Sequence, residues 1–450
     1  MTANKTKTVF ICNECGSAQP KWAGRCPECG AWSSLVEETV PKKQTRSVPV
    51  GERKLQPLNR TTSLAVNRIA TGVDELDRVL GGGFVPGMVV LLAGEPGIGK
   101  STLVLQILAQ VGGDRRLYFS GEESEEQLAL RATRMNINDA RILVACENNL
   151  ENIIHHIVQQ KPAMIVVDSI QTVFSDAYGN VPGSVTQVRE CAGALLKKAK
   201  EEQFIALLVG HITKDGMIAG PKVLEHLVDT VLYLEGGKTN FYRTLRSIKN
   251  RFGSTYEVGL FTMKDNGLIP VENPSEFFLA ERRKHVAGSA IAVSMEGTRP
   301  FLIEVQALVT QTSFGNPQRT ANGIDYRRLA MLIAVLGKRS GLPLRLQDVF
   351  VNIVGGLRIE ETAINLGVLV AIASSYKDTP LSPAAVFIGE VGLVGEIRSV
   401  PQIEQRVKEA LKFGFKPVYI PKSNLKQLKK VAGTEIIGVE SINQLFEMIF

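Results

Sequence analysis

The stretch Gly94-Glu95-Pro96-Gly97-Ile98-Gly99-Lys100-Ser101 fits the pattern G-x-x-x-x-G-K-[ST] at every fixed position. The apolar run at residues 88–93 precedes it and predicts a buried strand. Residues 102–109 follow it with apolar side chains at helical spacing. A strand, a glycine-rich loop and a helix in this order bring backbone N–H groups and a helix N-terminus to a polyphosphate. The sequence therefore predicts a binding site for ATP or GTP.

Each fixed position of this loop has an expected role. The glycines let the backbone turn and approach the phosphates, Lys100 is expected to reach the β- and γ-phosphates, and the Ser101 hydroxyl is expected to bind Mg²⁺. The residues predicted to bind the nucleotide are Gly94, Glu95, Pro96, Gly97, Ile98, Gly99, Lys100, Ser101 and Thr102.

The composition is that of an ordinary globular protein. At 450 residues, with 44% hydrophobic and 22% charged residues, the chain is long enough for two or three domains. No run reaches the roughly 18 apolar residues of a membrane span, and the first residues lack the apolar core of a signal peptide. We therefore expect a cytoplasmic protein without a membrane partner. The net charge of +7 weakly favours a polyanionic partner.

Four of the six cysteines form two C-x-x-C pairs, Cys12 with Cys15 and Cys26 with Cys29. In a reducing cytoplasm this pattern indicates a tetrahedral zinc site rather than disulfides. The gap between the pairs is shorter than in common zinc motifs but suits two knuckles. A redox-active dithiol pair is the alternative.

Composition and pattern divide the chain into four parts. Residues 1–35 are predicted to be the four-cysteine zinc module, with Trp22 and Trp32 as packing residues. The polar, proline-punctuated residues 36–64 are predicted to be a flexible linker. In residues 65–272, strand-like runs alternate with helical patterns, which predicts an α/β domain with a mostly parallel sheet. In residues 273–450 the pattern changes to that of a separate α+β domain.

Two acidic positions carry the predicted hydrolytic chemistry. Asp168 ends an apolar strand, where a Walker-B acid organises Mg²⁺, although an aspartate at a strand end is also common without function. Glu122 follows another strand and is predicted to polarise the attacking water, with Glu123 as its rival. Both glutamates also suit the start of a helix, where acidic residues are favoured.

Three further side chains are candidates for signalling. His211 follows a strand and either senses the γ-phosphate or is a structural histidine. Lys249 and Arg251 flank the aromatic Phe252 in residues 249–253. This segment is predicted to reach a neighbouring subunit's nucleotide, to stack on DNA, or to be a solvated turn.

Taken together, these motifs resemble the bacterial RadA/Sms family of recombination and repair ATPases. The resemblance rests on the four cysteines, the loop 94–101, the stretches 210–216 and 220–226, and the pentapeptide Lys249-Asn250-Arg251-Phe252-Gly253. It implies a RecA-like core, a C-terminal domain similar to the Lon protease domain, and the cofactors ATP, Mg²⁺ and Zn²⁺.

The resemblance also implies an activity. The family is similar to DnaB-like hexameric ring helicases and acts with RecA on single-stranded and branched DNA, where it extends heteroduplex by ATP-driven branch migration. In this family Glu122 lies where the water-activating glutamate is expected, and Asp168 lies at Walker B. Lys249 and Arg251 belong to the motif that couples nucleotide binding to DNA binding.

The Lon-like domain raises a rival function, ATP-dependent proteolysis by a serine and a lysine. No serine occurs at residues 361–367, where Thr362 is the only hydroxyl, and Glu404 stands at the expected lysine position with Lys408 one turn later. We therefore expect a proteolytically inactive domain. A nucleotide switch that recruits repair partners without motor activity is the third hypothesis.

Overall fold

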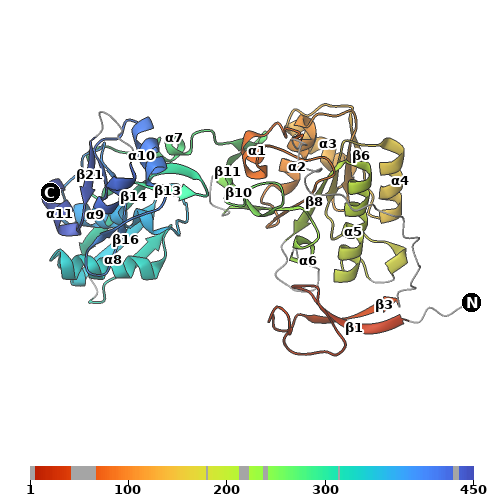
Figure 1. Cartoon of the computed structure of the whole chain (residues 1–450), viewed down its shortest axis with the longest axis horizontal. Helices are drawn as coiled ribbons and strands as arrows, with labels where there is room; N and C mark the ends of the chain where they lie inside the picture. Colours follow the sequence, from red (N-terminus) through yellow and green to blue (C-terminus); the bar gives the residue numbers. More distant parts are fainter. Residues whose placement is uncertain are drawn as a thin grey trace, which may run out of the picture. The chain divides into compact units, whose positions relative to one another are not determined.

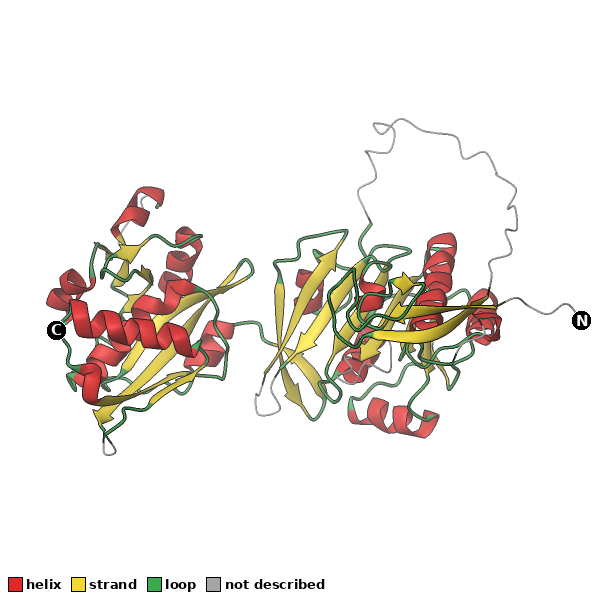
Figure 2. Ribbon diagram, turned by 90° about the horizontal axis from the view of Figure 1, so that it is seen from below, coloured by secondary structure: helices red, strands yellow, loops and turns green. Residues whose placement is uncertain are grey.

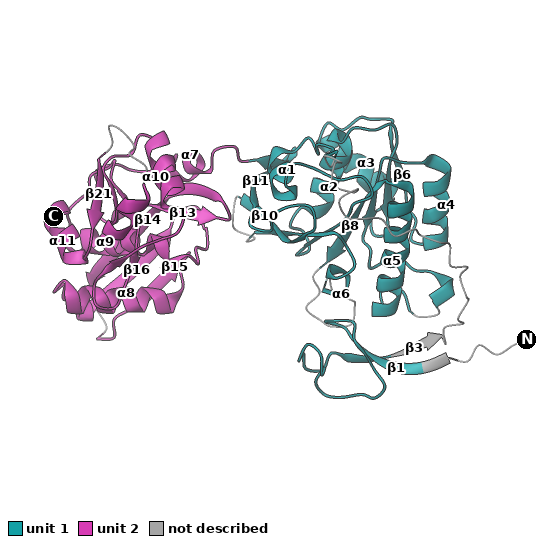
Figure 3. Ribbon diagram, viewed as in Figure 1, with its two compact units in different colours: residues 1–270 teal, residues 271–450 magenta. Residues whose placement is uncertain are grey.

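The computed structural model forms two compact units, residues 1–270 and residues 271–450 (Figure 3). The boundary lies next to residue 272, where the sequence pattern changes. The structure describes residues 6–41, 67–178, 181–211, 222–236, 242–312, 315–428 and 435–450. Most of the predicted linker, residues 42–64, lies outside these ranges.

Within the described part of the first unit, the central element is a nine-stranded sheet of order β12-β11-β10-β9-β4-β8-β7-β5-β6. The strands from β9 to β6 in this order are parallel, whereas β10, β11 and β12 continue the sheet antiparallel. Their bounds are β4 (Val89–Gly94), β5 (Arg116–Ser120), β6 (Ile142–Ala145), β7 (Met164–Asp168), β8 (Ile205–His211), β9 (Thr230–Glu235), β10 (Tyr242–Asn250), β11 (Val258–Lys264) and β12 (Gly267–Pro270).

Helices cover both faces of this sheet (Figures 1 and 2). On one face, Val90 and Leu92 of β4 pack in a cluster with α1 (Asp74–Leu80), α2 (Lys100–Gln110) and α3 (Glu125–Arg134). On the other face, Val89 and Leu91 pack with the remaining helices, which are α4 (Leu150–Gln160), α5 (Val185–Glu202) and α6 (Lys222–Glu225). Because side chains of a strand alternate between faces, β4 is apolar throughout and buried on both sides.

The predicted α/β fold class is confirmed. The helical patterns that alternate with strand-like runs in residues 65–272 include α3, α4 and α5. Each begins after a residue whose side chain accepts a hydrogen bond from the first turn, namely Ser124, Asn149 and Ser184. A further short 3₁₀ helix spans Asp176–Tyr178.

The four-cysteine module is a small antiparallel sheet of β1 (Thr6–Cys12), β2 (Ala18–Gln19) and β3 (Leu35–Pro41). Strand β3 pairs with β1 up to Pro41, so the ordered module extends past residue 35. The prediction that Trp22 and Trp32 pack inside the module is wrong, because they are 61% and 74% exposed. The small core consists of Cys12, Cys26 and Leu35 instead.

The second unit is an α+β domain, as predicted. Its described residues form a seven-stranded mixed sheet of order β15-β16-β14-β13-β17-β20-β21 and a two-stranded ribbon. The strands are β13 (Ser289–Glu296), β14 (Arg299–Gln311), β15 (Arg319–Asn322), β16 (Gln347–Ile353), β17 (Val386–Phe387), β18 (Glu390–Val391), β19 (Ile397–Arg398), β20 (Val418–Pro421) and β21 (Ile436–Val439). The α-helices are α7 (Pro274–Leu279), α8 (Tyr326–Arg339), α9 (Asn365–Tyr376), α10 (Ile403–Lys412) and α11 (Ile442–Ile449).

Short 3₁₀ helices complete the unit at Leu344–Leu346, Thr362–Ile364 and Lys422–Gln427. Helix α9 begins at Asn365, directly after the 3₁₀ turn at Thr362–Ile364. Helix α9 is buried from Asn365 to Ser374, which explains why it lacks a polar face.

Candidate nucleotide-hydrolysis site

The carboxyl ends of the parallel strands bring the predicted hydrolytic residues to one edge of the sheet. In the ladder, Gly94 of β4 pairs with His211 of β8, and Ser120 of β5 pairs with Asp168 of β7. Asp168 lies opposite Val209, which is on the same strand as His211. Open parallel sheets bind ligands at this edge, where loops leave the strands.

The glycine-rich loop joins β4 directly to α2. Gly99 precedes the helix with φ of 115°, a left-handed conformation that favours glycine. A Cβ atom at Gly99 would lie 2.7 Å from Cε of Met263, so the end of that side chain would have to move, and the positive φ would strain any other residue. The first backbone N–H groups of α2 thus stay open toward the site, as phosphate binding requires.

Lys100 is buried at the start of α2, with 4% of its surface exposed. Its Nζ donates hydrogen bonds to the carbonyl oxygens of Gly94 (2.9 Å) and Glu95 (3.0 Å), inside the loop. Burial lowers the pKa of Lys100, whereas the nearby carboxylates of Asp168 and Glu122 raise it. A cation already desolvated within the loop is well placed to transfer its hydrogen bonds to a phosphate.

Asp168 is buried at the end of β7 and accepts a hydrogen bond from the Tyr118 hydroxyl at 2.6 Å. Burial, and next the Asp168 carboxylate, raise the pKa of Tyr118, so the phenol remains a donor. This contact orients one carboxylate oxygen. Asp168 and Ser101, which lies at the first turn of α2, supply the oxygen donors that Mg²⁺ prefers.

Glu122 lies in the same cavity as His211. Its Oε1 accepts a hydrogen bond from the Ser169 hydroxyl at 2.7 Å and lies 3.2 Å from Nε2 of His211. The pKa of Glu122 is lowered from its usual value to about 2. The contact with His211 is the largest cause. The Ser169 hydroxyl and the charge of Lys100 lower the pKa further, whereas burial raises it. The carboxylate is therefore ionised and able to accept a proton from water.

Glu123 has a different environment. Its two carboxylate oxygens each accept a hydrogen bond of 2.6 Å from the guanidinium of Arg131 in α3. A bidentate pair of this kind neutralises the carboxylate and fixes its orientation. Of the two neighbouring glutamates, Glu122 therefore has the contacts expected of the water-activating residue.

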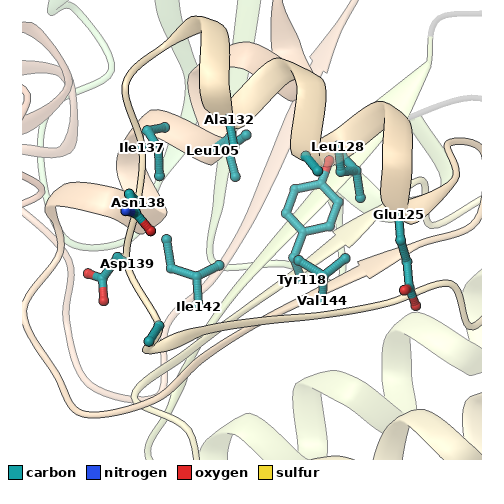
Figure 4. Close-up of a pocket in the computed structure, with 12 residues that line it drawn as sticks. Leu105, Tyr118, Glu125, Leu128, Ala132, Ile137, Asn138, Asp139, Ile142 and Val144 are labelled. Atoms are coloured by element: carbon teal, nitrogen blue, oxygen red, sulfur yellow. The ribbon is translucent and has the colours of Figure 1, made fainter.

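A cavity of about 590 Å³ lies between the phosphate-binding loop and the ends of β7 and β8. Its lining includes Pro96 of the phosphate-binding loop, Glu122 and His211. Another cavity, of about 340 Å³, lies on the α3 side, where Tyr118, Leu128 and Val144 contribute to a mostly apolar lining (Figure 4). That cavity contains no residue of the loop 94–101, so it is separate from the phosphate site.

Sequence reasoning did not single out Tyr118, Arg131 or Gln171. Gln171 lines the cavity of about 590 Å³. Its Nε2 donates a hydrogen bond to the carbonyl of His211 at 3.1 Å. The only sequence signal was that Gln171 is a polar residue shortly after the strand that ends at Asp168. Tyr118 and Arg131 gave no signal, because their partners are distant in the sequence.

Lys249 and Arg251 do not join this group. Asn250 of β10 pairs with Thr230 of β9, which pairs with Val90 near the amino end of β4. The phosphate-binding end of β4, at Gly94, lies roughly 13 Å farther along the strand at 3.3 Å per residue. The two cations therefore lie at the opposite edge of the sheet from Asp168 and His211.

At that edge both cations have partners in their own chain. Lys249 donates to the carbonyls of Glu225 (2.7 Å) and His226 (3.2 Å) at the end of α6. Arg251 lies 3.4 Å from the carboxylate of Asp229, which is 2% exposed. Arg251 is nevertheless 57% exposed at its side chain. The Arg251 side chain is thus paired with Asp229 and still accessible to solvent.

The four predicted metal ligands converge in the N-terminal module. The Sγ atoms of Cys12, Cys15, Cys26 and Cys29 all lie within 4.8 Å of one another, with 3.6 Å between Cys12 and Cys29 and 3.7 Å between Cys15 and Cys26. Tetrahedral ligands at 2.3 Å from a zinc ion would be separated by about 3.8 Å. The geometry fits a four-thiolate metal site.

In the second unit, the Thr362 hydroxyl donates to Glu390 at 2.7 Å. Glu404 and Lys408 form an exposed ion pair of 2.7 Å with each other. Neither arrangement provides a nucleophile next to a neutral amine.

The fold and the strand-edge geometry define an ATPase of the RecA-like class. In agreement, residues 69–274 match the model of the KaiC ATPase family. Residues 10–37 match a rubredoxin metal-binding domain, and residues 314–424 match subunit ChlI of Mg-chelatase. The chain is therefore an ATP-hydrolysing enzyme with an N-terminal metal-binding ribbon.

Relatives specify the family. The chain is 51% identical over 446 residues to the DNA repair protein RadA of Bacillus subtilis strain 168, covering 97% of each chain. It is 49% identical over 449 residues to the DNA repair protein RadA of Listeria monocytogenes, covering 99% of this chain and 98% of the relative. The chain belongs to the RadA family of DNA repair proteins.

Replacing either glutamate after β5 by glutamine separates their roles. We expect Glu122→Gln to lower kcat for ATP hydrolysis by about 10²-fold or more, because it removes the proton acceptor, while ATP binding persists. Glu123→Gln removes an ion pair with Arg131 and is expected to leave kcat within about twofold. Steady-state hydrolysis and nucleotide binding measure both, and the reverse order of effects would contradict the assignment.

The pH dependence tests the contact between Glu122 and His211. Because the pKa of Glu122 is lowered from 4.5 to about 2, its ionised form persists as pH falls, and its stabilising contribution is lost only between these values. His211→Ala removes the largest cause, so the pKa of Glu122 should rise.

The expected result is an acid-side decline of kcat that begins at higher pH in His211→Ala than in the parent. Profiles are normalised to their own maximum and measured above the acid-unfolding range. Coincident profiles would show that His211 does not hold the carboxylate ionised.

Proposed function

We propose that this chain is a DNA-dependent ATPase that processes recombination intermediates in DNA repair. In this proposal it promotes branch migration and heteroduplex extension with RecA on single-stranded and branched DNA, in the cytoplasm. It works as a homo-hexameric ring motor of the DnaB kind. None of the described helices is long and apolar enough to cross a membrane.

The proposal rests on one observation, which is that the predicted hydrolytic residues and the cations of residues 249–251 lie at opposite ends of the parallel strands. Lys100, Glu122, Asp168 and His211 converge at the carboxyl ends of the strands, whereas Arg251 lies at the amino end with an accessible guanidinium. A head-to-tail ring of identical subunits places one subunit's edge against a different edge of its neighbour. Arg251 and Lys249 would then act on the neighbour's nucleotide, as arginine fingers do.

The chemistry follows from the contacts of the site. Residues 94–102 surround the phosphates, and Lys100 moves its hydrogen bonds from the loop carbonyls to the β- and γ-phosphates. Asp168 and Ser101 hold Mg²⁺, which neutralises phosphate charge when bound. Glu122 accepts the proton of the attacking water, and His211 reports the loss of the γ-phosphate to the chain that follows β8.

The four-thiolate site is proposed to hold Zn²⁺ as a structural ion. The module has only a small core, so metal–thiolate bonds supply much of its folding free energy.

Proteolysis is disfavoured because the second unit combines Thr362, bonded to Glu390, with an ion-paired Lys408. A pure nucleotide switch is disfavoured because Glu122 lies beside His211 and Ser169 in the cavity that reaches Pro96 of the phosphate-binding loop, where a water-activating carboxylate is expected.

An ATPase assay without DNA and with single-stranded, double-stranded or branched DNA tests the proposal. We expect single-stranded or branched DNA to raise kcat, and each neutralised phosphate to add roughly 0.7 to the salt slope of binding. Lys100→Ala is the inactive control. A turnover independent of every DNA would favour a nucleotide switch and would refute the motor.

Mixing variants tests whether Arg251 acts across subunits. Lys100→Ala subunits lack a working phosphate site but keep Arg251, whereas Arg251→Ala subunits have the opposite defect. Mixed assemblies should therefore regain part of the ATPase activity that each variant lacks alone. Mixing Lys100→Ala with Glu122→Gln is the matched control, because both defects lie at the same edge. Equal behaviour of the two mixtures would place Arg251 outside the neighbour's site.

A further inference from the structure

Gln171 occupies an unusual position in the nucleotide cavity. It lies three residues after Asp168 at the end of β7 and two residues after Ser169, whose hydroxyl bonds to Glu122. Only 7% of its surface is exposed. Its Nε2 bonds to the carbonyl of His211, and its Oε1 is buried without a hydrogen-bond partner among the described residues. A buried amide oxygen without a partner is unfavourable, so this placement of Gln171 calls for an explanation.

The neighbouring His211 faces Glu122. Its Nε2 is buried and lies 3.2 Å from Glu122 Oε1. Among the described residues, the amide oxygen of Gln171 therefore lies without a partner beside the contact between His211 and Glu122. Side chains with unused hydrogen-bonding capacity at the edge of a nucleotide site are suited to change partners when nucleotide enters or leaves.

The side chain of Gln171 lies against the last residues of β8. A Cβ at Gly210 would lie 3.7 Å from Nε2 of Gln171, which places the amide across the last residues of the strand. Between Asp168 and Gln171, the N–H of Ile170 donates a hydrogen bond to the carbonyl of Val209 on the same strand β8. The segment that carries the magnesium ligand is thus tied to the end of β8 by one backbone and one side-chain hydrogen bond.

We propose that Gln171 is a positioning residue for ATP hydrolysis, which fixes the backbone of His211 so that the imidazole meets Glu122. Gln171 acts on hydrolysis only through His211. The inference rests on the proposed role of His211 in the reaction.

The experiment compares Gln171→Leu and Gln171→Glu with the parent in the full-length protein. Leucine removes the amide at similar size, and glutamate at neutral pH replaces the donor with an acceptor. Both are expected to lower kcat by about tenfold, as a small misplacement of a reacting group does, with KM for ATP within about twofold because the phosphate-binding loop is intact. Gln160→Leu is the matched control, since Gln160 lies at the end of α4, outside the lining of the cavity, and its side chain accepts a hydrogen bond from Arg115.

A double-mutant cycle separates positioning from a general structural effect. If Gln171 acts through His211, Gln171→Leu adds no further loss of kcat to His211→Ala. A parental kcat in both Gln171 variants, or losses that multiply with that of His211→Ala, would overturn the inference. A parental kcat in His211→Ala would instead refute the proposed role of His211, so the two failures are distinct.

Discussion

The structure depends on the register between neighbouring parallel strands. Asp168 and His211 lie far apart in the sequence and meet the phosphate-binding loop only because β7, β8 and β4 end at the same edge. Strand β4 is buried on both faces, so a one-residue slip would disturb two cores at once. Burial thereby fixes the relative positions of the nucleotide-binding and hydrolytic groups, and the site needs few direct bonds between them.

The opposite edge of the sheet is held by a different kind of interaction. The carboxylate of Asp229 accepts hydrogen bonds from the backbone of Val89 (3.0 Å) and from Lys200 (2.6 Å), and it also faces Arg251. Because β4 begins at Val89 and ends at Gly94, one strand joins this charge cluster to the phosphate-binding loop. The buried strand β4 therefore connects the phosphate-binding loop to the charge cluster around Asp229, which is the connection that the proposed ring motor requires.

Sequence reasoning recovered the features that depend on local pattern. The loop 94–101, the strand ending at Asp168 and the capped helices follow from motif, hydrophobic run and capping residue. It left Glu122 and Glu123 unresolved, because the difference between them is the distant partner: His211 in one case and Arg131 in the other. Trp22 and Trp32 were misassigned for a related reason. In a module of this size the cysteines and Leu35 fill the interior, which leaves no room for indole rings.

In the second unit, burial shows which charged side chains of α10 face the interior of the domain. The sequence comparison with Lon-type proteases considered Glu404 and Lys408, yet these side chains pair with each other on the outer face of α10. The cation that faces the interior is Arg406, which is 1% exposed and bonds to both carboxylate oxygens of Glu361, at 2.6 and 3.0 Å.

A guanidinium stays protonated in proteins and cannot act as the neutral amine base of a serine–lysine pair. Removing one partner of a buried ion pair costs about 3–5 kcal/mol, because the other charge is left uncompensated. Arg406 is therefore a structural partner of Glu361, and this inward-facing side chain of α10 does not supply a reversible proton acceptor.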